Sequence, residues 1–153
     1  MREGTATSED LLLIFRLNSE NYGVWGCDVR EVVDGSKVIS IPKSPVFIPG
    51  IINRYGNILT IIDIAFLLGL PPHQIDRDST ILFLRYAHMN IGLLTKSLKA
   101  VKTPPTDLVR IQPDSSFSEC ENTYSKGIFQ IDDVSVNLLD LEAIFKFLNE
   151  YTF

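Results

Sequence analysis

Short apolar runs separated by polar turn residues cover most of the chain. Asp, Asn, Gly and Ser recur between the runs, roughly every 8 to 12 residues, at positions where a turn would join two strands. Branched and aromatic residues dominate segments 11–17, 22–27, 29–33, 37–41, 51–53, 58–62, 81–86, 91–95, 127–131 and 134–139. The pattern predicts about nine or ten short strands, most of them in hairpins, as in small all-β barrels or sandwiches.

Two segments have helical rather than strand character. Asp63 precedes a short apolar run that ends at Gly69 and Pro71, which predicts a short helix with Asp63 as its N-cap. Near the end of the chain, apolar residues recur at helical spacing: Leu141, Ile144, Phe145 and Leu148. They predict an amphipathic helix over residues 141–151, capped by Asp140, with its apolar stripe packed on the core.

Residues 42–50 (PKSPVFIPG) form a loop of unusual composition. Its prolines lack the N–H that a strand ladder requires, so regular pairing is excluded here. Val46, Phe47 and Ile48 nevertheless lie between them. A loop this apolar either folds back onto the core or presents side chains to another molecule, and Phe47 is a candidate for either role.

The chain divides into similar halves. Residues 1–10 are polar and are expected to be disordered, and residues 11–153 are expected to form one domain. Within it, the hairpin-rich halves 11–70 and 80–140 meet at the polar, turn-rich segment 71–79, and residues 112–122 are the best candidate for a mobile loop. The halves suggest two small barrels packed together, although periodicity alone does not separate this from one large sandwich.

Charge and hydropathy narrow the class of protein. The 153 residues carry a formal net charge of −5 and no basic block, which argues against a nucleic-acid footprint and against electrostatic docking on anionic lipid. The most apolar stretch, residues 58–70, is too short to cross a bilayer and carries Asp63. The first ten residues lack a signal-peptide core, so a cytoplasmic location and reduced thiols at Cys27 and Cys120 are expected.

Candidate chemistry is sparse. His73, expected to be exposed in the linker, and His88, expected in a turn, do not have metal-ligand spacing from a cysteine or another histidine. Phosphate-loop, dinucleotide and G-x-S-x-G motifs are absent. Cys27 is interpreted as a structural thiol, and the pair Asp132-Asp133 as turn formers. We therefore expect no enzymatic activity, no cofactor and no metal.

The order of these features resembles the CheW family of chemotaxis coupling proteins. The resemblance covers about residues 10–149 and is closest in the first half. It rests there on LLLIFRL at 11–17, Asn21-Tyr22-Gly23, VREV at 29–32, IPKSPVFIPGIIN at 41–53, Gly56-Asn57-Ile58-Leu59 and Asp63-Ile64. The second half matches more loosely, at Ile91-Gly92-Leu93-Leu94, Gly127-Ile128 and Leu138-Leu139-Asp140-Leu141-Glu142.

The resemblance implies two small five-stranded, SH3-like barrels and a scaffold that couples methyl-accepting chemoreceptors to a CheA-type histidine kinase. Such a protein binds the kinase's CheW-like regulatory domain and holds receptor helices in the groove between the barrels. It does not bind nucleic acid or insert into the membrane. It is a monomer or self-associates weakly, and it is recruited from the cytoplasm to receptor arrays.

Carried over position by position, the partner-binding residues fall in two places. Val29 and Glu31 lie on one strand, and Val46, Phe47 and Gly50 lie in the proline-rich loop. Alternation along residues 29–33 places Val29 and Glu31 on one face, a mixed apolar and acidic strip. Such a strip suits either a polar-rimmed interface or a plain solvated strand.

Two departures from the family pattern affect the expected surface. Where the family has Asn-Leu-Arg-Gly, this chain has Asn53-Arg54-Tyr55-Gly56, so the arginine lies one position earlier. Because side chains alternate faces, the shift sends the guanidinium to the opposite side, and the family arginine's ion pair is not carried over. Arg54 and Tyr55 are both candidate partner-binding residues, and Tyr55 is expected to be exposed, as a binding residue or a hairpin cap. Thr95-Lys96 replaces Val-Asp, which puts a cation in place of an acid and alters charge complementarity with a partner.

Two other functions fit the same sequence. Barrels of this size could clasp a small ligand and make the protein a sensor, although pocket-type polar groups are few. Alternatively, the departures could mark an accessory paralogue that serves a pathway other than chemotaxis.

Overall fold

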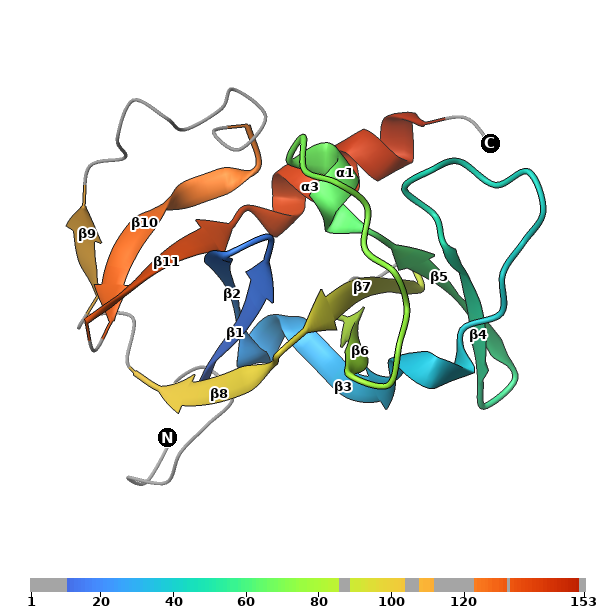
Figure 1. Cartoon of the computed structure of the whole chain (residues 1–153), viewed down its shortest axis with the longest axis horizontal. Helices are drawn as coiled ribbons and strands as arrows, with labels where there is room; N and C mark the ends of the chain where they lie inside the picture. The colour runs from blue at the N-terminus through green and yellow to red at the C-terminus, as the bar shows by residue number, and fades with distance from the viewer. Residues whose placement is uncertain (1–10, 86–88, 104–107, 112–122, 132, 152–153) are drawn as a thin grey trace.

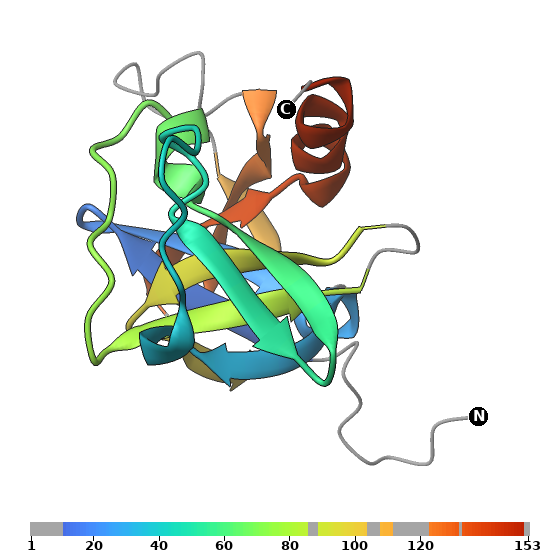
Figure 2. The same ribbon diagram turned by 90° about the vertical axis from the view of Figure 1, so that its right-hand side faces the viewer.

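The computed structural model describes residues 11–85, 89–103, 108–111, 123–131 and 133–151. The expectations for residues 1–10 and 112–122, and for His88, Cys120 and Asp132, lie outside the described residues. Strands in two curled sheets account for most of this structure, with a helix at the C-terminal end (Figures 1 and 2). The expectation of an all-β fold of two small barrels with a C-terminal helix is confirmed.

The first sheet has the strand order β8-β1-β2-β11-β10-β9. Its strands are β1 (Leu11–Leu17), β2 (Glu20–Trp25), β8 (Lys99–Lys102), β9 (Val109–Ile111), β10 (Ser125–Ile131) and β11 (Val134–Leu139). All neighbours are antiparallel except β2 and β11, which run parallel. The short edge strand β9 makes this sheet six-stranded rather than the five-stranded barrel expected.

The second sheet has the strand order β3-β6-β7-β5-β4. Its strands are β3 (Val29–Asp34), β4 (Gly50–Arg54), β5 (Asn57–Ile62), β6 (Ser79–Leu84) and β7 (Ile91–Lys96). Only β5 and β7 run parallel. The edge strands are therefore β3 and β4, and a single bridge between Ile39 and Ile51 links β4 to the segment that follows β3.

The expected halves do not correspond to the two sheets. The chain builds β1 and β2 in the first sheet, crosses through the 3-10 turn η2 (Gly26–Asp28), builds the whole second sheet, and returns after β7. Segments 11–70 and 80–140 therefore each contribute to both barrels, and the division at 71–79 is wrong. The parallel pairs β2–β11 and β5–β7 join segments far apart in sequence, and hairpin patterns do not reveal such pairs.

Most of the local predictions are confirmed. The pairs β1–β2, β4–β5, β6–β7 and β10–β11 are antiparallel hairpins. Helix α1 (Ile64–Leu67) starts where Asp63 Oδ1 accepts a hydrogen bond from the Ala65 N–H at 3.1 Å. Helix α3 (Leu141–Glu150) starts where Asp140 accepts one from the Ala143 N–H. Each aspartate satisfies a backbone donor that the helix leaves unpaired.

One expected hairpin does not form. Segment 37–41 does not pair with 29–33. β3 pairs with β6 instead, and the 3-10 turn η3 (Gly35–Lys37) follows it. Asp34 stabilises this turn by accepting a hydrogen bond from the Ser36 N–H at 2.9 Å, which keeps the pKa of the Asp34 carboxyl below its usual value. The turn directs the chain away from β3 and toward β4.

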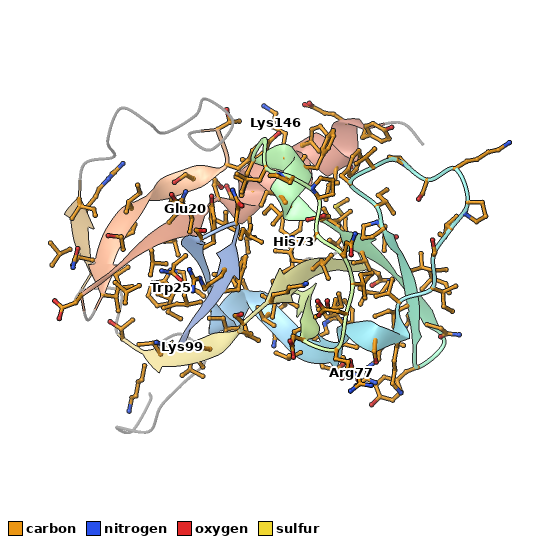
Figure 3. All side chains as sticks on the ribbon, viewed as in Figure 1. Glu20, Trp25, His73, Arg77, Lys99 and Lys146 are labelled. Carbon is orange, nitrogen blue, oxygen red and sulfur yellow. The ribbon has the colours of Figure 1, made fainter. Side chains whose placement is uncertain are left out.

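The described core consists of three clusters of buried side chains, one between the sheets and one in each barrel. A large cluster between the sheets takes side chains from β1, β2, β5, β6, β7, β11, α1 and α3, and a smaller cluster fills each barrel. In β1, Leu13 and Phe15 face the shared core while Leu12 and Ile14 face the interior of the first barrel. Figure 3 shows side chains filling the space between the two sheets. Burial on both faces explains why the strands read as nearly unbroken apolar runs.

Candidate partner-binding surface

A bulge in β3 separates Val29 from Glu31. The register between β3 and β6 shifts between these residues, since Val29 lies opposite Leu84 and Glu31 lies opposite Phe83. Val29 packs against the shared core, whereas Glu31 forms an ion pair across the second barrel. The expectation that the two share one face is therefore wrong, because an extra residue in a bulge breaks the alternation of faces.

Glu31 pairs with Arg54 and joins the two edge strands of the second sheet. A guanidinium N–H of Arg54 in β4 donates to Glu31 Oε1 in β3, and each side chain is 30% exposed. Arg54 Nε is buried without a hydrogen-bond partner. Although the family arginine's ion pair was not carried over to Arg54, this arginine makes one of its own. Together with the Ile39–Ile51 bridge, the pair links the sheet edges that an open barrel would leave apart.

Tyr55 is an exposed aromatic residue at the tip of the β4–β5 hairpin. It is 83% exposed, and its φ of 52° lies in the left-handed region. Gly56 also has a positive φ, and its N–H donates to Asn53 Oδ1. The guanidinium of Arg54 lies 4.5 Å from the centre of the Tyr55 ring, within the range of a cation–π contact. Tyr55 is thus exposed as predicted, with the Arg54 guanidinium over its ring.

Two adjacent residues of the proline-rich loop have opposite environments. Val46 is 63% exposed, whereas Phe47 is 3% exposed and belongs to the shared core. The interpretation of Phe47 as a partner contact is wrong for the free protein, because its ring is buried against α1 and α3. Of the two, only Val46 is available to a partner.

Gly50 has a packing role. A Cβ at this position would lie 2.3 Å from the carbonyl oxygen of Ile39, closer than any side-chain atom can approach. Gly50 therefore allows β4 to lie against the Ile39 segment and is itself buried. A direct contact between Gly50 and a partner stays a prediction.

Exposed apolar side chains mark the same barrel at positions that the sequence analysis missed. They are Val32, Ile39, Ile41 and Ile58, on β3, on β5 and in the segment after η3. A cavity of about 330 Å³ opens beside the loop, lined by Ile41, Pro42, Lys43, Ser44, Pro45, Ile48, Ile51 and Thr60. The only signal in the sequence was the occurrence of apolar residues in segments that alternation assigned to strands. It did not show which of them lie on edges.

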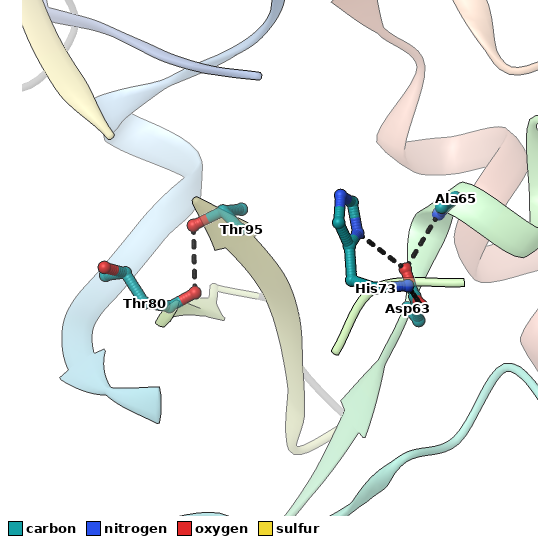
Figure 4. A network of polar contacts seen from close by, with 5 residues as sticks. All are labelled: Asp63, Ala65, His73, Thr80 and Thr95. Carbon is teal, nitrogen blue, oxygen red and sulfur yellow. Dashed lines mark hydrogen bonds and ion pairs between the residues drawn. The ribbon is translucent and has the colours of Figure 1, made fainter. Parts of the chain in front are cut away.

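Thr95 and Lys96, where the sequence departs from the family pattern, both interact with other residues of this chain. Thr95 is buried, and its hydroxyl donates to the carbonyl oxygen of Thr80 at 2.9 Å (Figure 4). The ammonium of Lys96 pairs with Asp76 in the segment before β6. The hydrogen bond from Lys96 is the largest cause that lowers the pKa of the Asp76 carboxyl, and the hydrogen bond from the Asp78 N–H is the next largest. The Lys96 charge is thus matched internally.

His73 is held by Asp63 rather than exposed in a linker. Its side chain is only 14% exposed. The His73 N–H donates to Asp63 Oδ2 at 2.7 Å, and ring Nδ1 lies 3.2 Å from Oδ1 (Figure 4). The expectation of exposure is wrong because Asp63, besides capping α1, ties the following segment back onto the helix. Nowhere in the described ranges do three or more His, Cys, Asp or Glu side chains group as metal ligands.

A charged depression lies between the barrels on the side of α3. Trp25, Asp28, Arg85, Lys126 and Glu142 line a cavity of about 150 Å³ together with Val24, Leu139, Leu141 and Phe145. Burial raises the pKa of the Asp28 carboxyl, and the nearby Lys126 partly offsets this shift. Among the helices in the described part of the chain, none has the length and apolar character needed to span a bilayer.

Comparison with known proteins gives a consistent result. The family model described as CheW-like domain matches residues 11–148. A probable chemotaxis protein CheW from Rhizobium etli is 30% identical over 134 residues, covering 88% of this chain and 86% of the relative. The chemotaxis protein CheW of Rhizobium meliloti is 24% identical over the same shares of both chains. The crystal structure of the scaffolding protein TtCheW from Thermoanaerobacter tengcongensis aligns with a TM-score of 0.73 and 25% identity, covering 92% of this chain and 90% of that one.

Proposed function

The chain belongs to the CheW-like domain family, and from that premise we propose that it is an adaptor of chemotaxis-type signal transduction. It couples chemoreceptors to a CheA-type histidine kinase and acts by binding, without catalysing a reaction. Its relatives are chemotaxis proteins, and a similar solved structure is that of a scaffolding protein. An adaptor of this kind works in the cytoplasm and is recruited to receptor arrays through its partners.

The second barrel is the proposed kinase-binding surface. The observation that carries this assignment is the exposure of apolar and aromatic side chains on its edges, above all Val46 and Tyr55. The ion pair of Glu31 and Arg54 lies beside Tyr55 and supplies charged groups next to these apolar residues. An apolar centre next to charged groups is the usual composition of a non-obligate protein interface. Exposed tyrosine in such a setting commonly contributes much of the binding energy.

Binding to the CheW-like regulatory domain of a CheA-type kinase from the same host tests the proposal. Titration calorimetry of the wild type should show a saturable complex. Val46→Asp should weaken it at least tenfold, because a carboxylate replaces an apolar contact and loses its water on binding. Val109→Asp is the matched control, since Val109 is equally exposed, at 62%, on an edge of the other barrel.

The binding results test the surface assignment and the adaptor function separately. If Val46→Asp and Val109→Asp both bind as the wild type does, the surface assignment is wrong. If the wild type binds neither the kinase domain nor the cytoplasmic part of a chemoreceptor, the adaptor function itself is wrong.

A further inference from the structure

An aromatic cluster connects the proline-rich loop with helices α1 and α3. Its centre is Phe47, whose ring centroid lies 5.5 Å from that of Phe66, 5.4 Å from that of Phe147 and 4.9 Å from that of Tyr151. Phe66 belongs to α1, Phe147 belongs to the last turns of α3, and Tyr151 follows that helix directly. The ring planes of Phe147 and Tyr151 meet that of Phe47 at 70° and 89°, the edge-to-face geometry that aromatic pairs favour.

The backbone around Phe47 is fixed by hydrogen bonds. The carbonyl oxygen of Phe47 accepts from the Asp63 N–H at 2.8 Å, which ties it to the start of α1. Beside it, the Ile48 N–H donates to the carbonyl of Pro45 at 2.9 Å, and the Ser44 hydroxyl donates to the carbonyl of Ile48 at 2.8 Å. The loop conformation therefore depends on two things: these few bonds and the packing of one buried ring.

The cluster lies where α3, which leaves the first sheet, meets the loop of the second barrel. Helix α3 follows directly from β11 of the first sheet, and the Asp140 N–H at their junction donates to the carbonyl of Tyr124. Its far end reaches the loop of the second barrel, as Figures 1 and 2 show. Val46 precedes Phe47 by one residue, so the position of the Phe47 ring determines where the Val46 side chain is presented.

We propose that Phe147 and Tyr151 are positioning residues for the kinase-binding surface. They hold Phe47 in place and thereby fix the proline-rich loop in the conformation that presents Val46 to the partner. The C-terminal end of α3 thus contributes to the binding surface by holding Phe47 in place. The inference rests on the proposed function for its partner, but the local effect on the loop can be measured without one.

Amide hydrogen exchange measured by NMR tests the local effect. In Tyr151→Ala, the amides of Ile48 and Asp63 should exchange about 3- to 10-fold faster, the factor that corresponds to loss of the aromatic pair between Tyr151 and Phe47. Amides of the β1–β2 hairpin should keep their rates. Tyr151→Phe keeps the ring contact with Phe47 and should therefore exchange more slowly at Ile48 and Asp63 than Tyr151→Ala does. Lys146→Ala, on the exposed side of the same helix (Figure 3), should keep the wild-type rates.

A double-mutant cycle on affinity for the kinase domain tests the functional effect. Tyr151→Ala should weaken binding about 3- to 10-fold, and its effect should nearly vanish in a Val46→Ala background, because both changes act through the same contact. Unchanged exchange at Ile48 and Asp63 in Tyr151→Ala overturns the inference, and so do strictly additive effects on affinity. If the wild type does not bind the kinase domain, the proposed function fails, while the exchange data still decide whether α3 positions the loop.

Discussion

Truncation of Phe47 and of its neighbour Val46 should have very different effects on the free energy of unfolding. The Phe47 ring is 3% exposed and contacts three other aromatic rings, whereas the Val46 side chain is 63% exposed. Phe47→Ala removes a buried ring and leaves a cavity, and such changes lower the free energy of unfolding by about 3 to 5 kcal/mol. We expect about 3 kcal/mol, the lower end, because the loop and the end of α3 are peripheral and can partly close the space. Val46→Ala should change it by less than about 0.5 kcal/mol.

Urea unfolding followed by far-ultraviolet circular dichroism measures this difference directly. The slope with denaturant should stay constant, so the midpoint reports stability. In thermal unfolding, a loss of 3 kcal/mol corresponds to a Tm lower by about 6 to 12 °C for a chain of this size. Binding to the kinase domain should be weakened by both variants at a temperature where both are folded, because Val46→Ala removes the contact itself and Phe47→Ala removes the packing that presents Val46. If Phe47→Ala unfolds at the same midpoint as Val46→Ala, the ring is not part of the core and the reasoning is refuted.

Two further predictions concern charged groups. Glu31→Gln should lower the free energy of unfolding by about 1 kcal/mol, because a partly buried Arg54 loses its charged partner. The exchanged variant, Glu31→Arg with Arg54→Glu, should be more stable in urea unfolding than the sum of its two single variants predicts, and simple additivity of those effects would contradict the pairing. The pKa of Asp76 is lowered in the folded state, chiefly by Lys96, so its contribution is present above the unfolded value of about 3.9 and is lost as the pH falls through the lower, folded value. The stability deficit of Asp76→Asn relative to the wild type should therefore shrink between about pH 5 and pH 2, and a constant deficit would contradict this assignment.

Local sequence signals predicted many of the elements but not the way they join. Hairpins form where turn residues separate two apolar runs, as in β1–β2 and β4–β5, because such turns bring neighbouring segments together without help from the rest of the chain. Helices α1 and α3 begin at the aspartates whose side chains cap them. The parallel pairs β2–β11 and β5–β7 have no comparable local signal, since the intervening chain is long and its return path is chosen by the core that it completes.

In the candidate partner-binding surface, too, the sequence predicted some features and not others. The exposure of Tyr55 follows from its place in a turn, and the exposed Val46 was among the residues assigned to partners. The burial of Phe47 could not be read from residues 42–50, which are compatible with either a plug or a contact. The separation of Val29 from Glu31 depends on one bulge against β6, and a period-two pattern does not show where a bulge lies.

The sequence by itself determined the strand-rich character, the hairpins, the two capped helices and the likeness to an adaptor family, because these depend on residue type and short-range spacing. Only the tertiary structure decided which apolar side chains stay exposed, that Glu31 meets Arg54, and that Lys96 is matched by Asp76. The two ion pairs join residues 23 and 20 positions apart in the sequence, and the Glu31–Arg54 pair forms only when both edge strands of the second barrel are in place. The proline-rich loop shows both contributions. Its composition alone predicted an apolar loop that cannot pair as a strand, and only the packing of α1 and α3 on Phe47 decided that Phe47 is buried and Val46 stays on the surface.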